Sequence, residues 1–446
     1  MYCLEKEEQD LAQKMQAPRG TRDYFGAPKL LRDSVSSILK TAFEKYCFEP
    51  LETPAFENLD VLSAKFAGGE EILKETYAFA DQGGRKLGLR YDFTVPLARF
   101  FASNPNMAKP FKRYALGSVW RDGPLKTGRW REFVQCDVDI VGVAGIEADA
   151  EILALTCEAL CSLCLPFKVR VNNRKLLQAV LEKAGIPVQN ELSVILSLDK
   201  LDKIGWQGVE KEFLGKGVAS PAQIESLKSL LLSGKEGLFK ALAGSQGLQE
   251  IEQLLAFANE MGFGQQVELS PTLARGLNYY TGNVFEAFLL NGEQLGLTSS
   301  LAGGGRYDNL VGGFLQKSSG RNETVCAVGI SFGLDVLCEA IARCGKEKEL
   351  TQSKSQQKAF VIPVGGEREA FAVVQRLRRE GARAAIDLIG RGLGKNVEYA
   401  SKQGYGYAVF VGKAETSIGK VKIKNLKSGE EKTVGISEAA AIIRGS

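Results

Sequence analysis

The chain has 446 residues, of which 44% are hydrophobic and 25% charged, with a formal net charge of +4 and no histidine. The absence of histidine excludes Ser-His-Asp and Cys-His nucleophiles and any metal site with imidazole ligands. Its chemistry must therefore depend on Arg, Lys, carboxylates, hydroxyls and bound ions. The nearly balanced charge permits a nucleic-acid partner but does not require one.

The length predicts several domains, at roughly 100–200 residues each. No apolar run approaches the ~18 residues of a membrane span, and the N-terminus is polar and of mixed charge, unlike a secretory signal. Nine cysteines spread through apolar segments indicate reduced thiols. We therefore expect a cytoplasmic protein without membrane contact.

The first part of the chain predicts a helix followed by closely spaced strands. Apolar residues at helical spacing predict a helix from Lys29 to Tyr46, and an extended segment follows from Leu51 to Phe56. Strand-like runs come next at 86–91, 111–120 and 133–141, and a helix is predicted over 147–163. Because no crossover helices separate these runs, we expect an antiparallel sheet.

The pattern changes near Lys175, after which helices dominate until about Gln266. Helices are predicted at 176–184, 194–204, 221–232 and 248–261. Strand signals return at Val267, 284–289 and 327–330. A helical insertion within a strand-rich catalytic domain explains this order most simply.

The stretch from Gly345 to Lys358 is almost without apolar residues and predicts a linker. Alternating strands and helices follow it, which indicates a small α/β domain. The predicted fold class is therefore α+β, with a catalytic domain (1–174 and 267–344), a helical insertion (175–266), a linker (345–357) and a C-terminal α/β domain (358–446).

The segment from Arg121 to Phe133 is the richest in residues that could bind a ligand. Three arginines, Arg121, Arg129 and Arg131, flank or lie within a turn between two strand-like runs. Guanidinium groups suit phosphate oxygens, and Phe133 offers a face on which a base can stack. Taken alone, the segment is better interpreted as a solvated hairpin.

Further motifs give this segment a context. They are Ala17–Asp23, Leu89–Pro96, Gln135–Ile140, an Arg-Gly-Leu-x-Tyr-Tyr run at 275–280 and a Gly-Gly-Arg-Tyr-Asp run at 304–308. With them, the sequence resembles histidyl-tRNA synthetases of the class II aminoacyl-tRNA synthetase family over essentially the whole chain. The resemblance implies an antiparallel catalytic sheet, a homodimer built partly through the region of Pro54, and a C-terminal anticodon-binding domain. It also implies ATP as substrate, Mg²⁺, and L-histidine and tRNA(His) as partners.

The resemblance also implies site residues. Arg121 would hold the α-phosphate side of ATP, Arg129 and Arg131 would add ATP contacts, and Phe133 would stack on adenine. Arg275 would lie between the substrate carboxylate and the α-phosphate, as a catalytic residue with Arg121. The implied histidine-binding residues are Asp92, Thr94 and Gln135 for the α-amino group, Asp139 and Tyr280 for the imidazole, and Tyr279 and Tyr307 near the pocket.

An active site without histidine suits adenylation, because the attacking carboxylate is already ionised and needs no protein base. Val336 stands where most class II enzymes have an arginine for the γ-phosphate. Either another cation, such as Arg306 or Arg343, replaces it, or ATP binding is weakened. The alternative functions are a non-catalytic regulatory or tRNA- or histidine-sensing relative, and a class II enzyme of another specificity, such as threonine or proline.

Two other patterns have simpler explanations. Cys157, Cys161 and Cys164 follow helical spacing, and small apolar core residues are favoured over a metal site. The run Lys420, Lys422, Lys424 and Lys427 is equally compatible with the solvated face of an edge strand and with RNA contact.

Overall fold

The computed structural model describes residues 15–64, 74–125, 130–275, 279–320, 323–351, 357–413 and 417–445. The chain divides into two compact units, Met1–Glu347 and Lys348–Ser446. No helix within the described ranges is long and apolar enough to cross a membrane.

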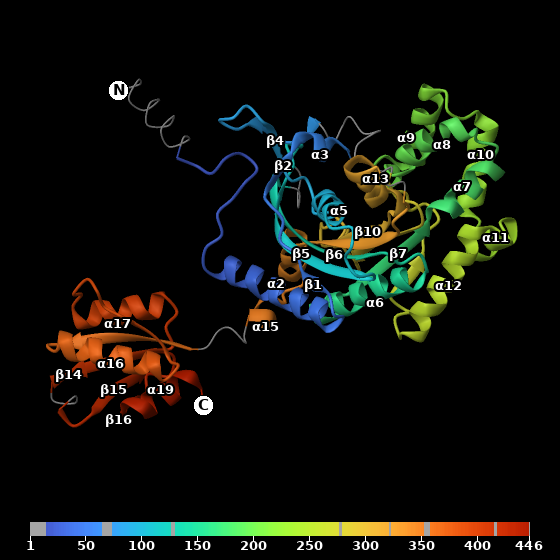
Figure 1. Cartoon of the computed structure of the whole chain (residues 1–446). Coiled ribbons are helices and arrows are strands. Elements are labelled where there is room, and N and C mark those ends of the chain that lie inside the picture. Colours follow the sequence, from blue (N-terminus) through green and yellow to red (C-terminus); the bar gives the residue numbers. More distant parts are fainter. Residues whose placement is uncertain are drawn as a thin grey trace, which may run out of the picture. The chain divides into compact units, whose positions relative to one another are not determined.

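An eight-stranded sheet forms the centre of the first unit (Figure 1). Its order is β1 (Glu49–Pro50), β5 (Phe111–Trp120), β6 (Glu132–Val141), β11 (Ala327–Gly333), β10 (Ala302–Arg306), β9 (Asn283–Leu289), β7 (Phe167–Asn173) and β8 (Val267–Leu269). All neighbours are antiparallel except β1 with β5 and β7 with β8 at the two edges. The expected antiparallel sheet is confirmed.

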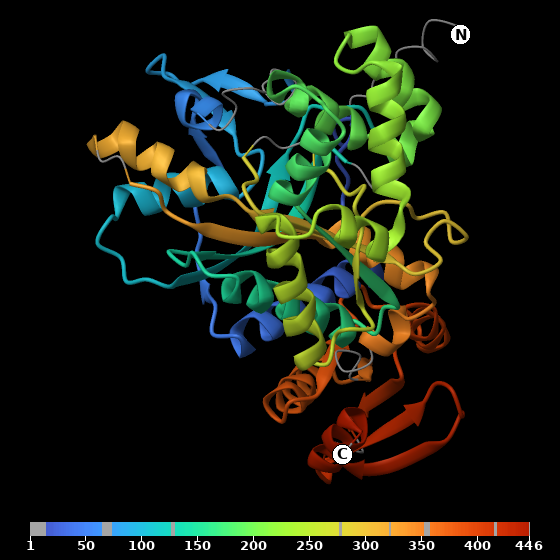
Figure 2. The same ribbon diagram turned by 90° about the vertical axis from the view of Figure 1, so that its right-hand side faces the viewer.

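Three helices cover one face of this sheet: α2 (Ala27–Lys45), α6 (Glu147–Ser162) and α14 (Leu334–Arg343). Strand β6 alternates along its length, so Cys136 and Val138 are buried beneath these helices. Phe43 of α2 packs its ring 5.6 Å from that of Phe332 in β11. Figure 2 shows α2 and α6 together on this side.

The opposite face of the sheet carries α5 (Thr94–Ser103) and α13 (Asp308–Ser319), which pack together over a shared core. The side chains of Leu97 and Phe101 from α5 meet Val311 and Leu315 from α13. Next to them lie α3 (Leu59–Ala64) and a small sheet of β2 (Phe56–Asn58), β4 (Lys86–Leu89) and β3 (Ala78–Ala80). Helices α5, α13 and α3 and the small sheet thus lie on the face of the large sheet opposite to α2, α6 and α14.

Strand β10 was not predicted, because its three central glycines have low strand propensity. The structure explains why glycine is needed. A Cβ on Gly304 would lie only 2.0 Å from the carbonyl oxygen of Gly329 in the neighbouring strand β11. The glycine run, whose composition is typical of a turn, is therefore a central strand that lies very close to its neighbour.

The helices between β7 and β8, where an insertion is expected, are α7 (Arg174–Lys183), α8 (Val188–Leu198), α9 (Leu201–Lys216), α10 (Pro221–Leu232), α11 (Gly234–Ala241) and α12 (Gln246–Glu260). The predicted helix over 194–204 is wrong: α8 ends at Leu198, α9 begins at Leu201, and α9 kinks at Gly205, where φ is 65°. Neither Gly nor Pro stands between α8 and α9, so the sequence gives no break there.

The second unit has a five-stranded sheet in the order β13 (Arg383–Ile386), β12 (Lys358–Val364), β14 (Tyr407–Gly412), β15 (Lys420–Asn425) and β16 (Glu431–Gly435). Its helices are α16 (Glu367–Arg379), α17 (Leu393–Lys402) and α19 (Ile436–Arg444). Helices α16 and α19 pack into one core, and α17 into a second. The short helix α15 (Glu347–Thr351) lies inside the expected linker, 345–357.

The lysine run lies in β15 and the turn that follows it, but the edge-strand interpretation is wrong, because β14 and β16 both pair with β15. Lys422 and Lys424 both form ion pairs with Glu431 of β16, at 2.8 and 3.0 Å. Two of the four lysines are therefore already engaged within the unit.

Candidate active site

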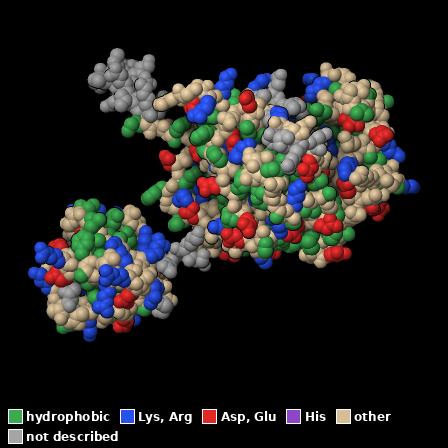
Figure 3. Space-filling model, viewed as in Figure 1, with side chains coloured by type: hydrophobic (Ala, Val, Ile, Leu, Met, Phe, Trp, Pro, Cys, Tyr) green, Lys and Arg blue, Asp and Glu red, His purple; other side chains and the backbone are tan. Residues whose placement is uncertain are grey.

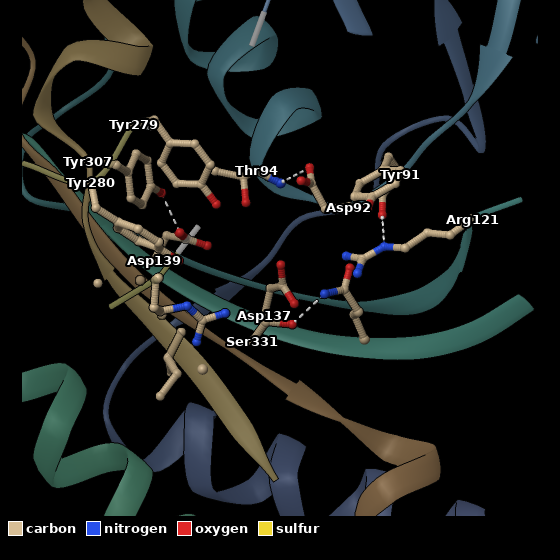
Figure 4. Close-up of a pocket in the computed structure, with 17 residues that line it drawn as sticks. Tyr91, Asp92, Thr94, Arg121, Asp137, Asp139, Tyr279, Tyr280, Tyr307 and Ser331 are labelled. Carbon is tan, nitrogen blue, oxygen red and sulfur yellow. Dashed lines mark hydrogen bonds between the residues drawn. The ribbon is translucent and has the colours of Figure 1, made fainter. Parts of the chain in front are cut away.

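A cavity of about 130 Å³ opens on the face of the sheet that carries α5 and α13 (Figure 4). Strands β6, β10 and β11 form its floor, and its sides are formed by the loop before α5 and by Arg275, Tyr279 and Tyr280 from between β8 and β9. Nine of the residues expected in the site line this cavity: Asp92, Thr94, Arg121, Gln135, Asp139, Arg275, Tyr279, Tyr280 and Tyr307. Residues far apart in the sequence therefore meet in one place.

Arg121 follows the end of β5 and lies at the edge of the cavity (Figure 4). Its Nε donates to the backbone oxygen of Tyr91 at 3.3 Å, and its guanidinium lies 4.1 Å from the centre of the Tyr91 ring. The Phe133 ring lies 5.0 Å from the same guanidinium, although Phe133 is outside the cavity lining. A cation is therefore held beside two aromatic faces.

Arg275 contributes a second cation from another side of the cavity. Its Nη1 lies 3.3 Å from the backbone oxygen of Phe285 and 3.9 Å from a carboxylate oxygen of Glu286. Burial opposes its charge, but Tyr280 and Glu286 together raise the pKa of the guanidinium above its ordinary value. Arg275 is therefore cationic, and an anionic group in the cavity would meet both it and Arg121.

Asp92 lies immediately before α5, where its Oδ1 accepts hydrogen bonds from the backbone nitrogens of Thr94 and Val95 at 3.0 and 3.1 Å. These contacts fix the carboxylate at the start of the helix. Across the cavity, the side-chain nitrogen of Gln135 donates to the hydroxyl of Ser331 at 2.7 Å. The three residues expected to hold an α-amino group, Asp92, Thr94 and Gln135, thus line one cavity.

Tyrosines form the other end of the cavity (Figure 4). The rings of Tyr279 and Tyr280 lie 4.7 Å apart, and Tyr307 meets Tyr279 edge-on at 6.0 Å. The Tyr307 hydroxyl donates to Asp139, and burial, with the Asp139 charge, raises the pKa of Tyr307 well above its usual value. The Tyr307 phenol therefore stays protonated at neutral pH and acts as a hydrogen-bond donor.

Several residues of this site were not predicted. Asp137 and Ser331 line the cavity, and Arg113 is 1% exposed behind it with its Nη2 2.6 Å from Asp139. One signal was available: Gln135, Asp137 and Asp139 alternate along a strand, which places all three on one face. The partnership of Arg113 with Asp139 depends on the register of two strands, which the sequence does not reveal.

Of the two other arginines expected to contact ATP, Arg131 is not among the residues that line the cavity. Arg129 lies outside the described residues. Arg131 pairs with Asp122 at 3.2 Å, and its backbone nitrogen donates to the backbone oxygen of Gly20 at 2.8 Å. Contacts of Arg129 and Arg131 with ATP remain predictions.

Val336 is 9% exposed near the start of α14, and the two suggested substitute cations lie in other parts of the structure. Arg306 is 6% exposed and donates through Nε to the buried Asp149 at 2.9 Å. Arg343 pairs with Glu339 at 2.7 Å and donates to a backbone oxygen. Both arginines therefore belong to other networks, and neither lines the cavity, so the suggestion that one of them replaces the γ-phosphate arginine gains no support.

The cysteine prediction is right for one residue and wrong for two. Cys157 is buried in α6, whereas Cys161 and Cys164 are exposed at the end of that helix. Among the described residues, no group of three or more His, Cys, Asp or Glu side chains could hold a metal ion.

A mainly antiparallel sheet with helices behind it and a cavity lined by arginines, carboxylates and tyrosines in front defines the catalytic fold of a class II aminoacyl-tRNA synthetase. A crystal structure of histidyl-tRNA synthetase from Nostoc sp. PCC 7120 shares this fold, with a TM-score of 0.79 at 29% identity. The comparison covers 97% of this chain and 99% of that one.

The chain belongs to the histidyl-tRNA synthetase family, whose family model matches residues 20–337. Residues 358–446 match the model described as an anticodon binding domain. A histidine--tRNA ligase 1 of Bacillus cereus is 40% identical over 432 residues, which cover 95% of this chain and 98% of the relative. A histidine--tRNA ligase of Aeropyrum pernix is 37% identical over 437 residues, 96% and 97% of the two chains.

Proposed function

We propose that this enzyme joins L-histidine to tRNA(His) in two steps with ATP as substrate, through a histidyl-adenylate. The observation that carries the proposal is the arrangement of one cavity. Two arginines, Arg121 and Arg275, line it together with three carboxylates and four tyrosines. Cations suit the phosphates and the substrate carboxylate, whereas the carboxylates suit the α-ammonium group and the ring of histidine.

In the first step, a carboxylate oxygen of histidine attacks the α-phosphorus of ATP. The bond from that phosphorus to the bridging oxygen breaks, and pyrophosphate leaves. The nucleophile is already ionised, so the protein's tasks are positioning and neutralisation of charge. Arg275 would hold the histidine carboxylate against the α-phosphate, and Arg121 would hold the phosphate from its other side.

In the second step, a hydroxyl of the terminal ribose of tRNA attacks the carbonyl carbon of the adenylate, and AMP leaves. The hydroxyl proton passes to a phosphate oxygen of the adenylate, so no protein base is needed. This route suits a chain that contains no histidine.

Mg²⁺ belongs to the proposal as the companion of ATP. The described residues form no metal cage. Mg²⁺ commonly binds through substrate phosphates with one or two carboxylates, and it would neutralise phosphate charge here. We expect chelation of Mg²⁺ to stop adenylation and its return to restore it.

The division of labour follows the expected domains. Residues 1–174 and 267–344 would catalyse, 175–266 would form the helical insertion, 345–357 the linker, and 358–446 would bind the anticodon. Lys and Arg side chains are prominent on the C-terminal unit in Figure 3, as contact with RNA phosphates requires. Removal of 358–446 should weaken tRNA binding far more than histidine-dependent ATP–pyrophosphate exchange.

A homodimer that acts in the cytoplasm completes the proposal. The region of Pro54 exposes apolar side chains: Phe56 and Phe79 are 50% and 44% exposed, with ring centres 6.2 Å apart. Such a pair suits a subunit interface. Sedimentation should give twice the chain mass, and Phe56→Asp should shift it toward the monomer. Cell fractionation should place the protein in the cytoplasm.

The alternative function, a non-catalytic regulatory or sensing relative, has no observation in its favour, since both arginines needed for adenylation line the cavity. Aminoacylation of tRNA(His) by the purified chain tests the proposal. We expect histidine to be attached in the presence of ATP, with no attachment of threonine or proline. Failure to charge tRNA(His), with histidine-dependent ATP use also absent, would contradict the function.

A further inference from the structure

Asp149 is a fully buried carboxylate that the proposed mechanism does not use. It lies in the first turn of α6, a helix on the face of the sheet opposite α5 and α13, and is 0% exposed. Its two oxygens have different partners. Oδ2 accepts from Nε of Arg306 at 2.9 Å, and Oδ1 accepts from the side-chain nitrogen of Asn283 at 3.0 Å. A buried carboxylate is tolerated only when its partners are well placed, so Asp149 ties the positions of Arg306 and Asn283 together.

The guanidinium of Arg306 is completely engaged inside the protein. It donates five hydrogen bonds, which equals the number of its N–H groups. The acceptors are the carboxylates of Asp149 and Asp308 and the backbone oxygens of Val143 and Gly145. Because the guanidinium is planar and rigid, these contacts fix its placement. Arg306 ends strand β10, and its neighbours in the chain, Gly305 and Tyr307, both line the cavity.

The segment that carries two of the cavity tyrosines is held by Arg306 and Asn283. Thr281 directly follows Tyr280, and its backbone nitrogen donates to the backbone oxygen of Arg306 at 2.8 Å. The Thr281 hydroxyl accepts from the backbone nitrogen of Asp308 at 3.1 Å. Asn283 comes two residues after Thr281. The chain that leaves the tyrosines is therefore held at two points by the partners of one buried carboxylate.

Asn283 is also held from its other side. Its side-chain oxygen accepts from Nδ2 of Asn173 at 2.9 Å, and the same nitrogen lies 2.7 Å from Oε2 of Glu250 in α12. Asn173 and Asn283 are 0% and 1% exposed, so water cannot replace a bond that is lost between them. In such a buried network, a change at Asp149 is passed to the neighbouring segment.

We propose that Asp149 is a positioning residue for the tyrosine end of the cavity. From the opposite face of the sheet it holds Arg306 and Asn283, and these fix the segment from Tyr279 to Asn283. Asp149 itself does not line the cavity and touches neither substrate. The assignment rests on the proposed function, since it concerns the end of the cavity expected to hold the amino acid.

Three variants separate positioning from a purely structural role. Asp149→Asn replaces the carboxylate by an amide of the same size. Arg306→Lys keeps a cation beside Asp149 but removes the planar fork, so it preserves the charge balance and alters the geometry. Glu151→Gln is the matched control, because Glu151 lies in the same helix and pairs with Lys112 of β5 at 2.6 Å.

Two kinds of measurement are needed. The Kd of histidine is obtained by titration calorimetry with the full-length protein, and the KM values of histidine and ATP by ATP–pyrophosphate exchange. Hydrogen–deuterium exchange reports on the backbone of residues 279–283 without requiring activity, and thermal unfolding checks that each variant is folded.

We expect Asp149→Asn and Arg306→Lys to raise the Kd and KM of histidine by ~10-fold, the value of about one hydrogen bond to a charged group. The KM of ATP should change by less than about twofold, because the arginines at the ATP end keep their contacts. Deuterium uptake should become faster at residues 279–283 and stay unchanged in α2. Glu151→Gln should match the unaltered protein in all of these measurements.

Two results would overturn the assignment. In the first, the folded variants Asp149→Asn and Arg306→Lys bind histidine as tightly as the unaltered protein. In the second, the affinities for histidine and ATP fall by the same factor, as a general loss of folded protein would cause. If Asp149→Asn does not fold, Arg306→Lys alone decides between these outcomes. An unaltered protein that neither binds histidine nor supports exchange with it would instead contradict the proposed function, which is a distinct outcome.

Discussion

The guanidinium of Arg275 occupies the space that a side chain at position 303 would need. A Cβ built on Gly303 would lie 1.8 Å from Nη1 of Arg275. Because Gly303 has no side chain, the guanidinium of Arg275 can lie directly against strand β10. This contact links the glycine run, which has poor strand propensity, to the arginine that the proposed mechanism depends on.

The Gly303→Ala substitution should displace the end of Arg275 while the fold persists, since the clash involves the tip of a flexible side chain. A shift of about 1 Å in a positioning group can cost ~100-fold in rate. We expect kcat/KM for histidine-dependent exchange to fall by that order, with little change in the melting temperature.

Gly313→Ala is the matched control. Gly313 lies in α13, and a Cβ there would meet no atom within 4 Å. Alanine is a better helix former than glycine by roughly 0.8–1 kcal/mol, so this variant should be active and slightly more stable. Similar activity in both variants would contradict the role given to the contact between Gly303 and Arg275.

Asp335 of α14 links both α2 and the segment before it to strand β6. Its carboxylate pairs with Arg32 at 2.7 Å and Arg22 at 2.9 Å and accepts from the Tyr24 hydroxyl. Burial alone would raise the pKa of Asp335, but Arg32, Tyr24 and the Val134 backbone nitrogen outweigh it and lower the pKa below its usual value.

The Asp335→Asn substitution should therefore lower the free energy of unfolding at pH 7 by ~3–5 kcal/mol, the cost of breaking a buried ion pair. A lowered pKa in the folded state means that the carboxylate stabilises the protein above its unfolded-state pKa, about 3.9. That contribution is lost as the pH falls below this value. Urea unfolding from pH 7 down to 3 should show the difference shrinking with acid, and a constant difference would count against the ion pair as its source.

Asp137 should behave in the opposite way. Because burial raises its pKa to about 7, the folded protein keeps a proton that the unfolded chain releases, and stability falls as pH rises from about 4 to 7. Asp137→Asn should match the unaltered protein near pH 4 and be more stable by a few kcal/mol above pH 7. Thermal unfolding across this range checks it, and a variant less stable at pH 8 would show that the ionised carboxylate stabilises the fold.

The absence of histidine has a physiological consequence for an enzyme that charges tRNA(His). Its own synthesis requires no charged tRNA(His), since the chain has no histidine codon to translate. During histidine starvation, its production should continue while that of a variant carrying several surface histidines declines. Equal amounts of the two proteins under starvation would contradict the idea that the absence of histidine favours continued synthesis.

The sequence predicts best the elements whose apolar residues follow one clear period. Helix α10 and strand β5 begin and end where expected, and β6 differs by one residue. The last elements, β16 and α19, were not predicted, although β16 completes the pairing of β15 and α19 packs into the same core as α16. Their roles depend on partners distant in the chain.

The sequence likewise predicts some residues of the site and misses others. Recognisable motifs identify Arg121, Arg275 and the tyrosines, and these residues line one cavity. The motifs do not identify Arg113, because its importance comes from the register of β5 against β6, which places it opposite Asp139. The motifs also suggest Arg306 as a cation that could bind the γ-phosphate, whereas in the structure Asp149, from a separate helix, pairs with it. Charge pairing across the fold therefore decides which arginines remain available for substrate.

The most direct measurement is ATP–pyrophosphate exchange by the purified full-length chain with each of the twenty standard amino acids in turn. The account predicts exchange that depends on histidine and on Mg²⁺, with every other amino acid near background, and its loss in Arg275→Ala without unfolding. Exchange driven by another amino acid, or none with histidine while ATP still binds, would contradict it.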